Sequence, residues 1–349
     1  MTMHTSLRPL ILPCLLLPAV AAAEVPSVAV DIPPVHSLVE RVMGDLGTPQ
    51  LVIQPGASPH GYAMRPSEAE ALAQADVVFW VSDGLTPWLA KARQSLAPDA
   101  QQVELMESAG TQRLTYRQGA TFEAHDHDEH HEEHEHEEHE GHGHHEEHDG
   151  HEHEHDAHDG HEHEQHAGHD HHDHSGWDPH GWLDPVNAQA WLDAIATSLA
   201  ELDPDNADIY RHNAEEARSE LDDLIDELET RLQQAQGTRF IVFHDAYQYF
   251  ERRFDVPGAG AIALGDASDP SPARIREIQQ RVAELGVQCV FREPQFNPAL
   301  VDSVFAGTGV ETSLVIDPLG VDLPLGTELY PALLRQLADG VTRCAAEAE

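Results

Sequence analysis

Residues 125–174 set the first limit on how this chain can fold. These fifty residues contain 22 His and 20 Asp or Glu, with no Lys or Arg and almost nothing apolar. Such a segment cannot bury enough apolar surface to offset the entropy lost on folding, so we predict a disordered, solvated loop at about residues 123–175. Neutral imidazoles and carboxylates bind zinc and similar divalent ions. The composition of this His-rich arm therefore indicates metal binding.

The remaining sequence is long enough for two ordinary domains, and it is also acidic. The formal net charge of the chain is −44, of which the arm contributes −20. Negative charge in both parts argues against binding to nucleic acid or to anionic membrane surfaces. It is compatible with a cationic ligand.

The N-terminus has the pattern of an export signal. Arg8 precedes the apolar run 10–20, and the alanines at 21–23 supply the small residues of a cleavage site. Cys14 lies in the middle of the apolar run, whereas the lipidated Cys of a lipoprotein should end it. No later apolar run reaches the roughly 18 residues needed to span a bilayer. We predict a cleaved signal peptide at residues 1–23 and a soluble, exported protein.

Cleavage of this signal leaves two cysteines in the mature chain, Cys289 and Cys344. In an oxidising compartment we expect them to form one disulfide. Two free, buried thiols are the alternative.

Apolar runs of strand length alternate with helical patterns on both sides of the arm. The run 77–81 precedes the arm, and the run 240–243 follows it. Strands that are apolar throughout and alternate with helices are typical of a parallel sheet covered on both faces. We therefore predict an α/β fold with an N-terminal lobe at 24–202 and a C-terminal lobe at 238–349, each a parallel sheet flanked by helices.

Two predicted helices show how the lobes are joined and where His60 lies. The helical pattern from Pro204 to Gln236 is too long for a crossover helix in one small sheet, so we predict a long, rigid linking helix at residues 203–237. Ser67 followed by Glu70 resembles a capping box and predicts that a helix begins at Ser67. His60 then lies in the loop ahead of that helix.

Three of the histidines outside the arm share a structural setting. The pattern places His36 in a helix with a structural role and His212 on the polar face of the linking helix. The other three outside the predicted signal, His60, His180 and His244, lie in loops or at strand ends, where ligands bind in open α/β sheets. Three imidazoles and one carboxylate form a complete tetrahedral zinc shell. The residues predicted to form it are His60, His180, His244 and Asp317.

Five motifs give the mature chain a recognisable resemblance to a known family. They are SPHGYAMRPS (58–67), DPHGWLDP (178–185), FHDAYQYF (243–250), REPQF (292–296) and DPLG (317–320). With these motifs the chain resembles the metal-binding solute-binding proteins of bacterial ABC importers, most closely their zinc-specific ZnuA type. The resemblance implies a monomeric periplasmic receptor, not an enzyme, that captures Zn²⁺ between its lobes and delivers it to the membrane permease.

The resemblance also implies roles for individual residues. By motif position, His60, His180 and His244 are metal ligands, and Asp317 matches the position of a carboxylate ligand in relatives. Some zinc-binding members have an acidic residue directly before the first His, where this chain has Pro59, so the fourth ligand is either Asp317 or water. Glu293 matches a family carboxylate near the site, which we expect to orient a ligand.

Three other functions stay open at this point. A manganese receptor of the same family is one, although manganese prefers oxygen ligands and its selective relatives tend to have a carboxylate where His244 stands. A secreted zinc hydrolase needs an open coordination position and a nearby general base, and Asp317 as a ligand would close that position. A periplasmic zinc buffer or chaperone would act mainly through the arm, and zinc stoichiometry with and without the arm would distinguish it.

Overall fold

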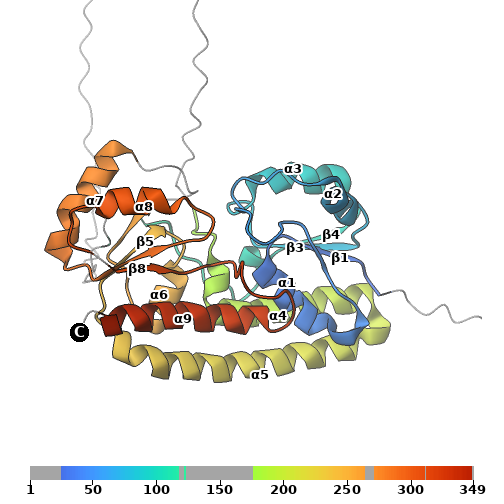
Figure 1. The fold of residues 1–349 in the computed structure, drawn as a ribbon. Helices are drawn as coiled ribbons and strands as arrows, with labels where there is room; N and C mark the ends of the chain where they lie inside the picture. The colour runs from blue at the N-terminus through green and yellow to red at the C-terminus, as the bar shows by residue number, and fades with distance from the viewer. Residues whose placement is uncertain (1–24, 118–121, 123–175, 264–270, 311, 348–349) are drawn as a thin grey trace, which may run out of the picture. The chain divides into compact units, whose positions relative to one another are not determined.

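The computed structural model describes residues 25–117, 122, 176–263, 271–310 and 312–347. The predicted signal peptide and the His-rich arm lie outside the described residues and stay predictions from the sequence. The described segments on the two sides of the arm belong to one compact unit. This unit contains two separate four-stranded sheets (Figure 1), and the exact lobe boundaries stay a prediction.

The first sheet is entirely parallel and has the strand order β2-β1-β3-β4. Its central strands β1 and β3 are buried along their whole length, which explains their uninterrupted apolar sequences. Helices α2 and α3 cover one face and α1 covers the other (Figure 1). The elements are β1 (Val28–Val30), α1 (Pro33–Met43), β2 (Gln50–Leu51), α2 (Pro66–Ala73), β3 (Val77–Trp80), α3 (Pro87–Leu96) and β4 (Gln101–Glu104).

The second sheet repeats this organisation with the order β6-β5-β7-β8, again all parallel. Helices α7 and α8 lie on one face, and α6 and α9 lie on the other (Figure 1). The predicted fold class is therefore confirmed. The elements are β5 (Phe240–His244), α6 (Gln248–Phe254), β6 (Gly260–Ala263), α7 (Pro272–Leu285), β7 (Cys289–Arg292), α8 (Pro298–Phe305), β8 (Thr312–Val315) and α9 (Leu329–Glu347).

A disulfide between Cys289 and Cys344 fastens α9 to the second sheet. The two Cα atoms are 5.9 Å apart, and both cysteines are buried. The predicted pairing is confirmed.

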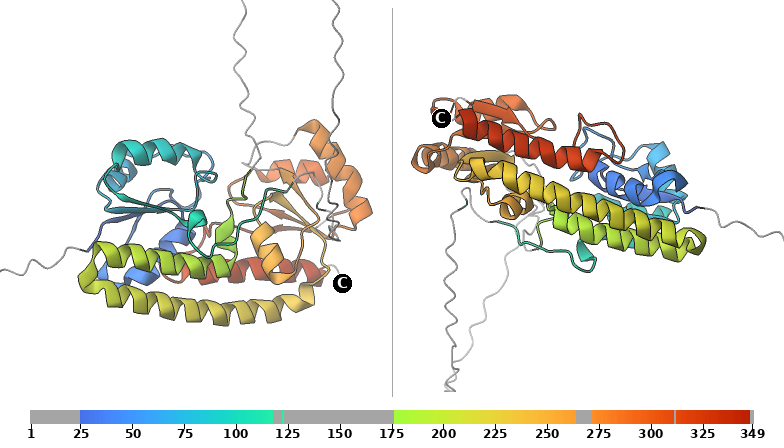
Figure 2. Two further views of the ribbon diagram at one scale, coloured as in Figure 1. Left: turned by 180° about the vertical axis from the view of Figure 1, so that it is seen from behind. Right: turned by 90° about the horizontal axis from the view of Figure 1, so that it is seen from below.

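Helix α5 (Ala207–Leu232) runs past both sheets (Figures 1 and 2). Its 26 residues span about 39 Å, and it packs against α1, α9 and α4 (Pro185–Leu202). It is shorter than the predicted linker because Pro204–Asn206 and Gln233–Ala235 form 3-10 turns at its ends. No helix in the described part of the chain is long and apolar enough to cross a membrane.

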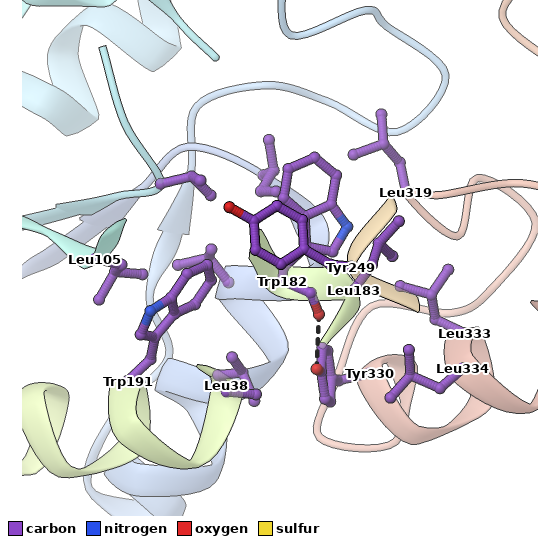
Figure 3. Close-up of a cluster of buried hydrophobic side chains, with 14 of the residues drawn as sticks. Leu38, Leu105, Trp182, Leu183, Trp191, Tyr249, Leu319, Tyr330, Leu333 and Leu334 are labelled. Atoms are coloured by element: carbon purple, nitrogen blue, oxygen red, sulfur yellow. Dashed lines mark hydrogen bonds between the residues drawn. The ribbon is translucent and has the colours of Figure 1, made fainter. Parts of the chain in front are cut away.

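Trp182 connects the turn before α4 to the loop after β8 and to α9. Its indole Nε1 donates a hydrogen bond to the carbonyl of Pro318, and its own carbonyl accepts one from the Tyr330 hydroxyl, both at 2.7 Å. Figure 3 shows Trp182 in a cluster of buried side chains that includes Leu38 of α1 and Leu333 of α9. Because His180 is only two residues away, these bonds also fix how His180 approaches the second sheet.

Helix α2 begins one residue earlier than the sequence indicated. Pro66 occupies its first position, where a missing backbone N–H costs nothing. Glu68, rather than Glu70, accepts a hydrogen bond from the backbone N–H of Arg65, at 2.6 Å. The predicted position of His60 in the preceding loop is unchanged.

Candidate metal centre

Three histidines from different segments meet at one point. His60 lies in the loop after β2, His180 precedes the 3-10 turn Gly181–Leu183, and His244 ends β5. The ring centroids are 5.7 Å (His60 to His180), 6.0 Å (His60 to His244) and 5.3 Å (His180 to His244) apart. One ligand atom from each lies within 4.8 Å of the other two. This spacing suits three nitrogens around a single ion.

The three imidazoles line a small cavity with a largely apolar rim. Its volume is about 20 Å³, which is room for one water molecule or one ion. His180 and His244 are almost completely buried, and His60 is partly exposed. The other lining residues are Ser58, Pro59, Trp182, Glu293, Gln295, Phe296, Pro318 and Leu319.

The ring of His180 is held by the carboxylate of Asp178. One carboxylate oxygen lies 2.7 Å from Nδ1 of His180 and accepts the backbone N–H of His180 at 3.0 Å. Burial raises the pKa of Asp178 to about 7, although the bond from the His180 backbone and the charge of Arg117 lower it. With Nδ1 directed at this carboxylate, Nε2 is the ring nitrogen that can coordinate a metal. Asp178 was not among the predicted site residues, although its spacing from His180 in DPHGWLDP, Asp-x-His, was the available signal.

The ring of His244 is held in the same way by Glu293. Oε1 of Glu293 lies 2.7 Å from Nδ1 of His244, and both side chains are buried. Burial by itself lowers the pKa of His244, but the charge and hydrogen bond of Glu293 raise it, so that the net pKa is above the ordinary value. Glu293 thus has the geometry of the orienting carboxylate that the family resemblance implies.

Arg117 offsets further negative charge behind His244. Its guanidinium forms hydrogen bonds with both carboxylate oxygens of Asp245, and with Oε2 of Glu251 at 2.6 Å. Both carboxylates are buried, so each would carry a large desolvation cost without this partner. No sequence pattern indicated this role, because Arg117 and the two acids are far apart in the chain.

Asp317 is placed differently from the three histidines. It follows β8 and is buried, but it is not part of the group of ligand atoms within 4.8 Å of one another. Its carboxylate accepts hydrogen bonds from the backbone N–H of Leu319 (2.9 Å), from Nε2 of Gln295 (3.1 Å) and from the backbone N–H of Val321. The structure therefore brings together three of the four predicted ligands.

The other two histidines of the described residues lie where the sequence places them. His36 is buried in α1, with Nδ1 3.6 Å from a carboxylate oxygen of Glu40, and His212 is exposed on α5. Neither belongs to the group of possible metal ligands found among the described residues.

Comparison with known proteins gives a consistent result along the chain. The model of a family described as zinc-uptake complex component A, periplasmic (ZnuA), matches residues 28–344. The chain is 45% identical over 324 residues to the high-affinity zinc uptake system protein ZnuA of Paracoccus denitrificans (strain Pd 1222), covering 93% of each chain.

Solved structures with low sequence identity share the fold. A ZnuA deletion mutant lacking residues 138–173 in its own numbering, with zinc bound, superposes with a TM-score of 0.66 at 22% identity, covering 90% of this chain and 96% of that one. The periplasmic zinc-binding protein TroA from Treponema pallidum gives 0.67 at 18% identity, covering 92% and 99%.

Proposed function

This chain belongs to the ZnuA family of periplasmic zinc-uptake components, and from this premise we propose that it captures one Zn²⁺ ion at His60, His180 and His244 for delivery to an ABC importer. The observation that carries the proposal is the meeting of three imidazoles, two of them held by buried carboxylates, at a cavity of one-ion size.

The donor set favours zinc over manganese. Zinc binds three imidazoles well, whereas manganese prefers carboxylate, carbonyl and water oxygens. The nitrogen donor of His244 stands where manganese-selective relatives are expected to have a carboxylate. The zinc uptake function in the name of the Paracoccus relative supports the same choice.

We propose that a water molecule, not Asp317, completes the shell around the captured ion. The Asp317 carboxylate already accepts three hydrogen bonds, and moving it to the ion would leave two backbone N–H groups to find other acceptors. An exchangeable fourth ligand suits a receptor that must release its ion.

The location and partner follow from the same family membership. We propose that the signal peptide at 1–23 is removed on export, that the mature protein is a periplasmic monomer, and that it delivers zinc to the membrane permease of the importer. The family is one of solute receptors rather than enzymes, and we assign no catalytic role to the site.

Single substitutions of the three histidines test the site. Replacing His60, His180 or His244 by Ala should each remove tight zinc binding in competition with a chelator, because the ion would keep only two of its three imidazole ligands. The metal-free proteins should stay folded by circular dichroism. His212→Ala removes an exposed imidazole from α5 and should leave the dissociation constant unchanged. Full affinity in His60→Ala would show that the site is assigned wrongly.

A further inference from the structure

His60 differs from the other two histidines in how its backbone is supported. His244 ends a strand and His180 begins a 3-10 turn, but His60 lies in the middle of residues 52–65, which contain no helix or strand. A ligand on such a loop must be positioned by side chains from neighbouring elements, or the loop must be ordered at a cost when the ion binds.

Trp88 makes the contact that supplies this support. It is the second residue of α3, and its indole Nε1 donates a 2.8 Å hydrogen bond to the carbonyl of Pro59. That carbonyl belongs to the same planar peptide group as the backbone nitrogen of His60. The proline ring fixes the φ angle of Pro59, so a bond to its carbonyl orients the peptide from which His60 extends.

A second anchor lies on the other side of His60. The Tyr62 hydroxyl donates to Oε1 of Glu68 at 2.8 Å, and Glu68 is itself bonded to the backbone of Arg65 at the start of α2. The rings of Tyr62 and Trp88 also contact each other, with centroids 5.7 Å apart. The His60 loop is thus held between α2 and α3, and Trp88 touches it on both sides of the ligand.

We infer that Trp88 is a positioning residue that presents His60 to the captured ion. The inference rests on the proposed function, because it takes His60 as a metal ligand. The indole N–H fixes the peptide of His60 before the ion arrives, in the way that Asp178 and Glu293 fix the rings of the other two ligands. Its loss should chiefly speed zinc dissociation, since most affinity changes within one site appear in the off-rate.

Trp88→Phe tests the inference because it removes the N–H donor and keeps an aromatic ring beside Tyr62. Loss of one hydrogen bond of ordinary strength should raise the zinc dissociation constant by about five- to tenfold. Trp80→Phe is the matched control. Trp80 lies buried in β3, and its Nε1 has no hydrogen-bond partner within the described residues. The control should leave zinc affinity within about twofold of the parent, because Trp80→Phe removes no hydrogen bond.

Combining Trp88→Phe with His60→Ala separates positioning from a general effect on the fold. If Trp88 acts through His60, Trp88→Phe should not weaken the residual zinc binding of His60→Ala any further. An equal loss in both backgrounds would overturn the inference, as would an unchanged dissociation constant for Trp88→Phe alone. Unchanged binding in His60→Ala would instead contradict the proposed function itself.

Trp88→Phe could weaken zinc binding through a general loss of stability. If it lowers the melting temperature of the metal-free protein more than Trp80→Phe does, a second variant is needed. Incorporating β-(3-benzothienyl)alanine at position 88 keeps the size and shape of the indole and replaces only the N–H by sulfur. The same rise in the dissociation constant with an unchanged melting temperature supports the positioning role. Parental affinity in this variant overturns it.

Discussion

Asp317 matches the position of a metal ligand in relatives, but its carboxylate accepts hydrogen bonds from backbone N–H groups. Its sequence, Asp-Pro-Leu-Gly, lets the side chain accept the N–H groups of residues two and four positions later, as Asp commonly does in turns. These bonds shape residues 317–321, which include Pro318 and Leu319 at the cavity. A family motif identifies the position but not which atoms the carboxylate faces.

Asp317→Ala should therefore lower stability more clearly than zinc affinity. Leaving backbone N–H groups without their acceptor costs about 1–3 kcal/mol in a buried turn, and urea unfolding of the metal-free protein measures this loss. The zinc dissociation constant should rise less than in His60→Ala, because the ion keeps its three imidazoles. A loss of affinity as large as that of His60→Ala, without a loss of stability, would identify Asp317 as a ligand.

His60 and His244 were predictable from sheet topology, whereas the carboxylates that hold the ligand rings were not. His60 lies in the loop after β2 and His244 ends β5, and ligands gather at the carboxyl ends of such strands. Asp178 and Glu293 act through one carboxylate oxygen each, at 2.7 Å from a ring nitrogen. Glu293 was found only by resemblance to a family, since a distance of this kind depends on loop geometry that no periodicity records.

At the scale of elements, apolar pattern was a reliable guide to strands and a weaker one to helix ends. The buried run Val77–Trp80 is a central strand as predicted, because a strand covered on both faces tolerates little polarity. Helix α5 ends earlier than its pattern, since Gln233–Ala235 tightens into a 3-10 turn. The last turn of an α-helix is often a 3-10 turn. Because the same side chains fit an α-helix and a 3-10 turn, the sequence pattern does not show where one changes to the other.

The disulfide that joins β7 to α9 should contribute measurably to the stability of the protein. Cys289 and Cys344 are separated by 55 residues, and closing a loop of this length stabilises the folded state by about 4 kcal/mol in the chain-entropy model. Replacing both cysteines by Ala should lower the free energy of unfolding by about this amount. Thiol titration of the unfolded, unreduced parent should find no free thiol in the mature protein.

Reductant provides the matched control for this pair. It should destabilise the parent to the level of the double variant and leave the double variant unchanged. Two reactive thiols in the unfolded parent, or an equal response of both proteins to reductant, would contradict the assignment.

At the scale of the whole molecule, the sequence predicts two sheets but not how their elements meet. Trp182 bonds to Pro318, Tyr330 bonds to Trp182, and the hydroxyl of Ser37 in α1 donates to the carbonyl of Thr327 at 3.0 Å. Each contact joins residues more than a hundred positions apart, and neither the apolar pattern nor the motifs predict which residues pair. Such contacts help to bring His244 close to His60 and His180.

The His-rich arm carries far more ligands than one site needs, which raises the question of where tight binding resides. Its 22 imidazoles are enough for several zinc ions, but each ion must offset the entropy of ordering a chain whose composition predicts no fixed structure. The three cavity histidines are already held within 4.8 Å of one another. We expect weak sites in the arm and one tight site in the cavity.

Lowering the pH should release zinc from the arm. As pH falls through an ordinary imidazole pKa of about 6.5, protonation of the arm's histidines prevents them from binding metal. The formal charge of the arm then moves from −20 towards about +2. The weaker zinc equivalents should be lost over this range, and isothermal titration at several pH values measures them directly.

Deleting residues 125–174 decides between a receptor and a buffer. The deletion should keep one tight zinc per molecule, remove the weaker equivalents and slow zinc acquisition mainly when the metal is scarce, because tethered ligands raise the local zinc concentration. A variant that keeps the arm's length and acids but has Asn for every arm histidine should match the deletion, since imidazoles bind the ions. If the tight equivalent disappears with the arm while the cavity histidines remain, the arm is the primary site and the protein acts as a buffer.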